Sequence, residues 1–90
     1  MKSDFKESFL KDVRKIKEHA VKLKIQEAIE AVEAAPTLSS VPNMKKLKTG
    51  SSYYRIKVGD HRIGIAYECN TVIFIRALHR KDIYRYFPMA

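Results

Sequence analysis

The chain has 90 residues, 46% of them hydrophobic, and a formal charge of +8, which favours a single folded domain over a disordered chain. The start, MKSDFKES, lacks the apolar stretch of a signal peptide, and no apolar run approaches the roughly 20 residues of a membrane span, so we expect no membrane partner. The single cysteine, Cys69, excludes an internal disulfide and a cysteine-based zinc cluster, so we expect a protein of the reducing cytoplasm with neither a metal nor a cofactor.

The positive charge is concentrated in the C-terminal half. Residues 1–45 carry nine basic and seven acidic residues, a net charge of +2, whereas residues 46–90 carry nine and three, a net charge of +6. An excess of positive charge in one half of the chain attracts polyanions, including nucleic acids, acidic proteins and membrane surfaces.

Two amphipathic helices are predicted in the first 35 residues. Apolar residues recur every three or four positions over residues 5–20, after Ser3 or Ser8 as a candidate N-cap, and again over residues 21–35. Pro36 should end the second helix, because it has no N–H and its ring clashes with the preceding turn. The pattern indicates a helical hairpin with one shared apolar side.

A loop is predicted over residues 36–52, which are rich in proline, serine, asparagine and glycine and also carry Lys45, Lys46 and Lys48. The hydrophobic period then changes to two, which predicts three strands over residues 53–58, 61–68 and 71–78.

Tight turns at Gly59-Asp60 and Cys69-Asn70 should join these strands into an antiparallel meander, and the end, RKDIYRYFP, reads as a short helix. We therefore predict an α+β fold for residues 1–90 as one domain. In this fold an N-terminal helical hairpin packs on a twisted antiparallel sheet, and a short C-terminal helix follows.

A two-residue turn in the first hairpin divides its residues between two faces. The apolar face should pair Val58 with His61, Ile56 with Ile63, and Tyr54 with Ile65. The opposite face should pair Lys57 with Arg62, Arg55 with Gly64, and Tyr53 with Ala66. Like charges directly opposite each other cost roughly 0.2–1 kcal/mol, so stability does not explain this second face. The small residues Gly64 and Ala66 predict that its surface is open to a ligand.

The position of Arg76 depends on the second turn. A two-residue turn would place Arg76 opposite Ile63 on the apolar face, whereas a three-residue turn would place it opposite Gly64, on the face that carries Lys57 and Arg62. We expect the three-residue turn, because burying an unpaired guanidinium costs more than an irregular strand. His79 and Arg80 should then leave the sheet near the other basic residues, with Tyr84 about one helical turn further on.

Such a face suits the phosphodiester of RNA. Cleavage by the 2′-OH needs a base, cations to stabilise charge on phosphorus, and an acid for the leaving oxygen. Guanidinium groups of Arg55, Arg62 and Arg76 match phosphate oxygens. Lys57, whose charged form the neighbouring cations disfavour, and His79, which titrates near neutrality, are candidates for proton transfer. The alternative is an ordinary solvated strand face that discourages edge pairing.

The strings YYRIKVGDHRIGIAYE and LHRKDIYRYF resemble toxins of type II toxin–antitoxin systems, the RelE/ParE superfamily, and the similarity extends from about Phe5 to Phe87. The family usually opens with a β-strand, so the short polar start predicts a first strand that is brief or absent. The RelE branch implies an mRNA endonuclease that cuts in the ribosomal A site without a metal. It also implies an acidic antitoxin partner that covers the basic face.

The family's site residues transfer to matching positions of this chain. Its basic strand residues match Arg55 and Lys57, and its later arginines and tyrosine match Arg62, Arg80 and Tyr84. That branch often has lysine where Arg55 stands, and an arginine cannot act as a base, so the base role moves to Lys57 or His79. The predicted catalytic residues are Lys57, Arg62, His79, Arg80 and Tyr84. The predicted phosphate-binding residues are Lys46, Lys48, Tyr53, Arg55 and Arg76.

Two other functions fit the same pattern. A ParE-type toxin would share the fold but inhibit DNA gyrase by binding it, without cutting RNA. A non-catalytic member of the family would only bind nucleic acid.

Overall fold

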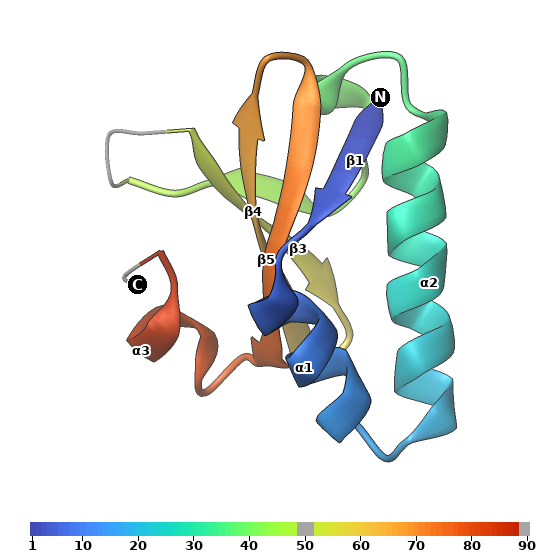
Figure 1. The fold of residues 1–90 in the computed structure, drawn as a ribbon, viewed down its shortest axis with the longest axis vertical. Coiled ribbons are helices and arrows are strands. Elements are labelled where there is room, and N and C mark those ends of the chain that lie inside the picture. Colours follow the sequence, from blue (N-terminus) through green and yellow to red (C-terminus); the bar gives the residue numbers. More distant parts are fainter. Residues whose placement is uncertain (49–51, 89–90) are drawn as a thin grey trace.

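The computed structural model describes residues 1–48 and 52–88. Five strands form one sheet in the order β1-β5-β4-β3-β2 (Figure 1). The strands are β1 (Lys2–Phe5), β2 (Met44–Lys46), β3 (Tyr53–Val58), β4 (His61–Glu68) and β5 (Thr71–His79). The helices are α1 (Glu7–Lys15), α2 (His19–Ala34), α3 (Ile83–Tyr86) and a 3₁₀ turn, Leu38–Ser40. No helix in this part of the chain is long and apolar enough to cross a membrane.

The predicted α+β architecture is confirmed, with two corrections to the sheet. The first strand, expected to be brief or absent, is present and brief: β1 has four residues. It pairs parallel to β5, so the sheet is mixed and not purely antiparallel. A second short strand, β2, lies inside the segment expected to be a loop and pairs with β3. Both strands are at sheet edges, where a few backbone hydrogen bonds suffice and the alternating apolar pattern of an inner strand is not required. Residues 49–51 of the expected loop lie outside the described residues.

The helices differ from the prediction at their ends. The first helix begins at Glu7 and ends at Lys15, and the second begins at His19. Ser3 lies in β1, and the Ser8 hydroxyl donates to the Ile75 carbonyl at 2.6 Å, so neither is an N-cap. The predicted end at Pro36 is confirmed, because α2 stops at Ala34.

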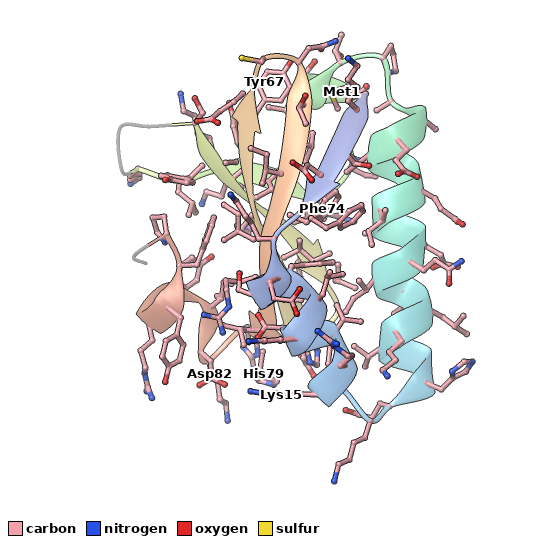
Figure 2. All side chains as sticks on the ribbon, in the orientation of Figure 1. Met1, Lys15, Tyr67, Phe74, His79 and Asp82 are labelled. Carbon is pink, nitrogen blue, oxygen red and sulfur yellow. The ribbon has the colours of Figure 1, made fainter. Side chains whose placement is uncertain are left out.

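The core lies between α1, α2 and one face of the sheet. Figure 1 shows α2 and α3 on opposite sides of the sheet, and Figure 2 shows Phe74 between the sheet and α2. The rings of Phe5, Phe9 and Phe74 have centroid separations of 5.0–5.8 Å. The predicted apolar face is confirmed by the burial of Ile56, Ile63 and Ile65, none more than 2% exposed. Burial of this one face is enough to hold the sheet against the helices.

All six predicted pairs of the β3–β4 hairpin are present. Arg76 lies opposite Gly64 as predicted, but the cause differs from the one expected. The turn has two residues, Cys69 and Asn70, both with the positive φ that such turns need. The register shifts further along, between Gly64 and Ile65, where β5 carries an extra residue. This bulge changes which face each later residue of β5 occupies.

Candidate nucleic-acid interface

Five basic residues lie on the sheet face that turns away from α1 and α2. Lys45 of β2 pairs with Arg55 of β3, Lys57 of β3 pairs with Arg62 of β4, and Arg76 of β5 pairs with Gly64. We call the first four, Lys45, Arg55, Lys57 and Arg62, the cationic face. None of the four has a carboxylate as its direct cross-strand partner. The face therefore retains positive charge that an anion would neutralise.

Backbone carbonyls hold the two arginines of this face. A terminal nitrogen of Arg55 donates to the Asn43 carbonyl at 3.2 Å, and one of Arg62 donates to the carbonyls of Gly59 at 2.8 Å and His61 at 2.9 Å. The Nε of Arg55 is buried without a hydrogen-bond partner among the described residues. A neutral carbonyl orients a guanidinium but leaves its charge in place. Both side chains are thus positioned in advance for phosphate oxygens.

Arg76 is held differently. Its Nε and a terminal nitrogen donate to the two carboxylate oxygens of Asp12 at 2.7 and 3.1 Å, and its guanidinium lies 5.6 Å from the centre of the Tyr86 ring. The hydrogen bond that Arg76 donates to the Asp12 carboxylate raises the pKa of Arg76 above its ordinary value. The predicted phosphate-binding role of Arg76 thus receives no support from its contacts, since its charge already has a partner.

Asp12 was not anticipated as a functional or structural residue. It is 6% exposed, and one of its oxygens also accepts the Ala77 N–H at 3.0 Å, on the edge of β5 beyond the end of β1. A signal was available in the sequence. Asp12 lies three residues after Phe9 and four before Ile16, on the apolar side of the helix, where a carboxylate needs a partner.

The surface above Gly64 is covered, so the prediction of an open surface there is wrong. A Cβ at Gly64 would lie 2.6–2.8 Å from three ring carbons of Phe87. Phe87 is 1% exposed, and Tyr53 packs against its ring at 5.6 Å in an edge-on arrangement. The small residue admits the protein's own C-terminal segment, not an external ligand.

His79, expected to leave the sheet near the other basic residues, lies on the helix-facing side of β5. It pairs with His61, with ring centroids 5.7 Å apart, and its Nδ1 accepts the Lys81 N–H at 3.1 Å. It lines a hollow with Lys15 near the lower end of α1 (Figure 2). Burial and then the neighbouring His79 lower the pKa of His61. The sheet therefore separates His79 from Lys57.

The other predicted residues lie outside the cationic face, at different places in the fold. Arg80 is bound to the hairpin turn: its N–H donates to the Asp60 carbonyl at 2.8 Å, and its Nε lies 3.7 Å from an Asp60 carboxylate oxygen. Tyr84 of α3 is 57% exposed. Lys46 pairs with Tyr54 and so belongs to the helix-facing side, and Lys48 is exposed beyond β2.

A hollow of about 470 Å³ adjoins the cationic face at Tyr53. Its lining also includes the basic residues Lys6 and Arg76, the acidic residue Glu7, and the aromatic residues Tyr86 and Phe87. Aromatic and basic side chains of this kind can stack on bases and contact phosphates of single-stranded RNA. Within residues 1–48 and 52–88, no group of three His, Cys, Asp or Glu side chains is placed to hold a metal ion.

Comparison with known proteins identifies the family. Residues 4–84 match the ParE toxins of type II toxin–antitoxin systems, parDE. The chain is also 42% identical to Toxin RelE3 of Methanocaldococcus jannaschii, over 98% of this chain and all of that protein. The chain belongs to the ParE toxin family. The predicted superfamily and the predicted class of function, a toxin of a type II system, are therefore confirmed.

Two solved structures have the same fold as this chain. The RelB–RelE antitoxin–toxin complex from Methanococcus jannaschii matches with a TM-score of 0.79 and 39% identity, over 94% of this chain and 99% of that chain. The YoeB dimer from Staphylococcus aureus matches with a TM-score of 0.71 and 17% identity, over 88% and 95%. At that identity the second match bears on the fold alone.

Proposed function

We propose that this toxin is a metal-independent endoribonuclease that cuts mRNA in the ribosomal A site and thereby inhibits translation. The observation that carries the proposal is the placement of Arg55, Lys57 and Arg62 on one sheet face without carboxylate partners across the strands. Membership of the family and 42% identity to Toxin RelE3 support a toxin of the RelE kind. The cationic face would bind the phosphodiester, and exposed Tyr84 would stack on a base or donate a proton.

The reaction we propose begins with the 2′-OH. Lys57 in its neutral form takes the hydroxyl proton, the 2′-oxygen attacks phosphorus, and the bond to the 5′-oxygen breaks, which leaves a cyclic phosphate. The guanidinium groups of Arg62 and Arg80 stabilise the charge that develops on the phosphate. We assign the proton for the leaving 5′-oxygen to the Tyr84 hydroxyl. The position of His79 on the helix-facing side favours Lys57 as the base.

We propose an acidic antitoxin as the regulatory partner. Related toxins from Methanococcus jannaschii and Pyrococcus horikoshii have been solved in RelE–RelB complexes. In this chain the net charge of +6 in residues 46–90 would attract an acidic segment, which would compete with RNA for the cationic face. An inhibitor of translation would act in the cytoplasm, where we place this protein.

The match to ParE toxins favours a second candidate, inhibition of DNA gyrase by binding. Expression of the chain in cells labelled with methionine and thymidine separates the two functions. The endoribonuclease stops methionine incorporation first, while DNA synthesis continues. Continued translation together with a DNA-damage response would contradict the endoribonuclease and support the gyrase inhibitor.

Substitutions of the proposed catalytic residues test their assigned roles. Lys57→Ala and Arg80→Ala should abolish toxicity while the protein still folds and binds its antitoxin. Tyr84→Phe keeps the ring but loses the hydroxyl, so it separates stacking from proton donation. Lys11→Ala, at an exposed position of α1, is the matched control and should remain toxic. Full toxicity of both Lys57→Ala and Arg80→Ala would show that the assigned site is wrong.

A further inference from the structure

The C-terminal helix α3 depends on its contacts with the sheet. It has only four residues, Ile83–Tyr86, and an isolated helix of that length is not stable in water. Two of its contacts are fully buried: Ile83 is 0% exposed and Phe87, the residue after the helix, is 1% exposed. The Phe87 N–H donates to the Ile83 carbonyl at 2.8 Å, so both anchors lie on the same side of this turn.

Phe87 occupies a space that only glycine leaves open. Three of its ring carbons, Cδ2, Cγ and Cδ1, lie 2.6, 2.7 and 2.8 Å from the position that a Cβ would take at Gly64. Contacts below 3.0 Å require one group to move, and here the neighbour is a rigid ring already packed against Tyr53. Even alanine at position 64 would therefore push Phe87 away from β4.

A third contact, next to the first two on the same sheet face, also fixes α3. The Tyr86 ring lies on the guanidinium of Arg76, which the buried carboxylate of Asp12 holds in place. With Ile83, Tyr86 and Phe87 attached in this way, Tyr84 remains 57% exposed. Tyr84 therefore points outward from a short helix whose orientation other residues determine.

We propose that Gly64 and Phe87 are positioning residues for catalysis: the ring of Phe87, seated on Gly64, holds α3 so that Tyr84 lies beside the cationic face. This inference rests on the proposed endoribonuclease function. Neither residue touches the RNA in this scheme. Because the main hydrophobic core lies on the opposite side of the sheet, release of α3 would leave the fold and the cationic face intact.

The test combines three variants, Gly64→Ala, Phe87→Ala and the double variant, in cleavage assays on ribosomes with mRNA in the A site. Each single variant should lower kcat by about 10- to 100-fold, because a displacement of about 1 Å can cost that much in rate. The KM for mRNA-programmed ribosomes should change less than about threefold, because the cationic face is unchanged. The double variant should be no slower than the slower single variant, since both substitutions remove one shared contact.

Hydrogen exchange gives a readout that does not depend on activity. In Gly64→Ala and Phe87→Ala the amide of Phe87 should lose protection, whereas the amides of β3–β5 should keep theirs. Phe87→Leu, which keeps apolar bulk, should retain more protection and more activity than Phe87→Ala. Ile25→Val, a core truncation on the far side of the sheet, serves as the control and should lower stability without changing kcat.

The possible failures are distinguishable. If the parent chain cleaves RNA and the variants release α3 without any fall in kcat, the positioning role is wrong. If Gly64→Ala keeps full protection at Phe87, the steric part of the inference is wrong. If the parent chain cleaves no RNA under any condition, the proposed function itself fails, and the catalytic role of Gly64 and Phe87 fails with it.

Discussion

Removal of the Asp12 carboxylate should destabilise this toxin more than any substitution of an exposed charge. Asp12 is 6% exposed and accepts three hydrogen bonds, two from Arg76 and one from the Ala77 N–H. In Asp12→Ala the guanidinium of Arg76, a side chain that is 26% exposed, loses its carboxylate partner. The buried N–H of Ala77 also loses its acceptor. The first loss costs about 3–5 kcal/mol in a fully buried pair and the second about 1–3 kcal/mol.

These costs overlap, and water can partly solvate Arg76, so we expect a loss of about 2–4 kcal/mol in the free energy of unfolding. For a domain of this size, the melting temperature should then fall by roughly 10–20 °C. Urea denaturation followed by fluorescence or circular dichroism measures the change. Asp12→Asn keeps an oxygen that can accept the Ala77 N–H and should cost less than Asp12→Ala.

The control lies on the same helix. Glu7 and Arg14 form an ion pair at 2.8 Å with side chains 64% and 66% exposed, so Glu7→Ala should cost less than about 1 kcal/mol. A double-mutant cycle between Asp12 and Arg76 isolates the pair from the hydrogen bond to Ala77. If Asp12→Ala costs no more than Glu7→Ala, the carboxylate does not hold α1 to β5 and our reasoning about this contact is refuted.

Two further predictions follow from the faces of the sheet. Lys45→Ala should weaken RNA binding and reduce its salt dependence more than Lys46→Ala does, because Lys45 pairs with Arg55 on the cationic face while Lys46 lies on the other side. Titrations with RNA at several salt concentrations measure both effects, and equal effects of the two variants would contradict this assignment. The pKa of His61 is lower in the folded state than in the unfolded chain, so the unfolded chain binds more protons. His61 therefore stabilises the fold above its unfolded pKa near 6.5, and this stability is lost as the pH falls through the lower pKa of the folded state. The melting temperature should fall between pH 7.5 and pH 5. His61→Asn should reduce this fall, and His19→Gln, at an exposed position of α2, should leave it unchanged.

The features that the sequence determined by itself are local. The two-residue turn at Gly59-Asp60 and the alternation of apolar residues place every pair of the β3–β4 hairpin, because the side-chain period of a strand is two and a short turn leaves one register. Pro36 ends α2 for an equally local reason. The strings in this hairpin and near the C-terminus also sufficed to identify the toxin superfamily.

Tertiary structure decided what depends on residues far apart in the chain. Asp12 and Arg76 are 64 positions apart, and no local pattern indicates that the carboxylate also accepts an edge N–H of β5. One extra residue in β5 moves His79 to the helix-facing side, since a shift of one position exchanges the two faces of a strand. Glycine at position 64 shows only that something approaches the strand closely. The packing of the whole C-terminal segment shows that the approaching group is the ring of Phe87 and not RNA. Residue spacing could not predict this, because a close contact depends on three-dimensional shape.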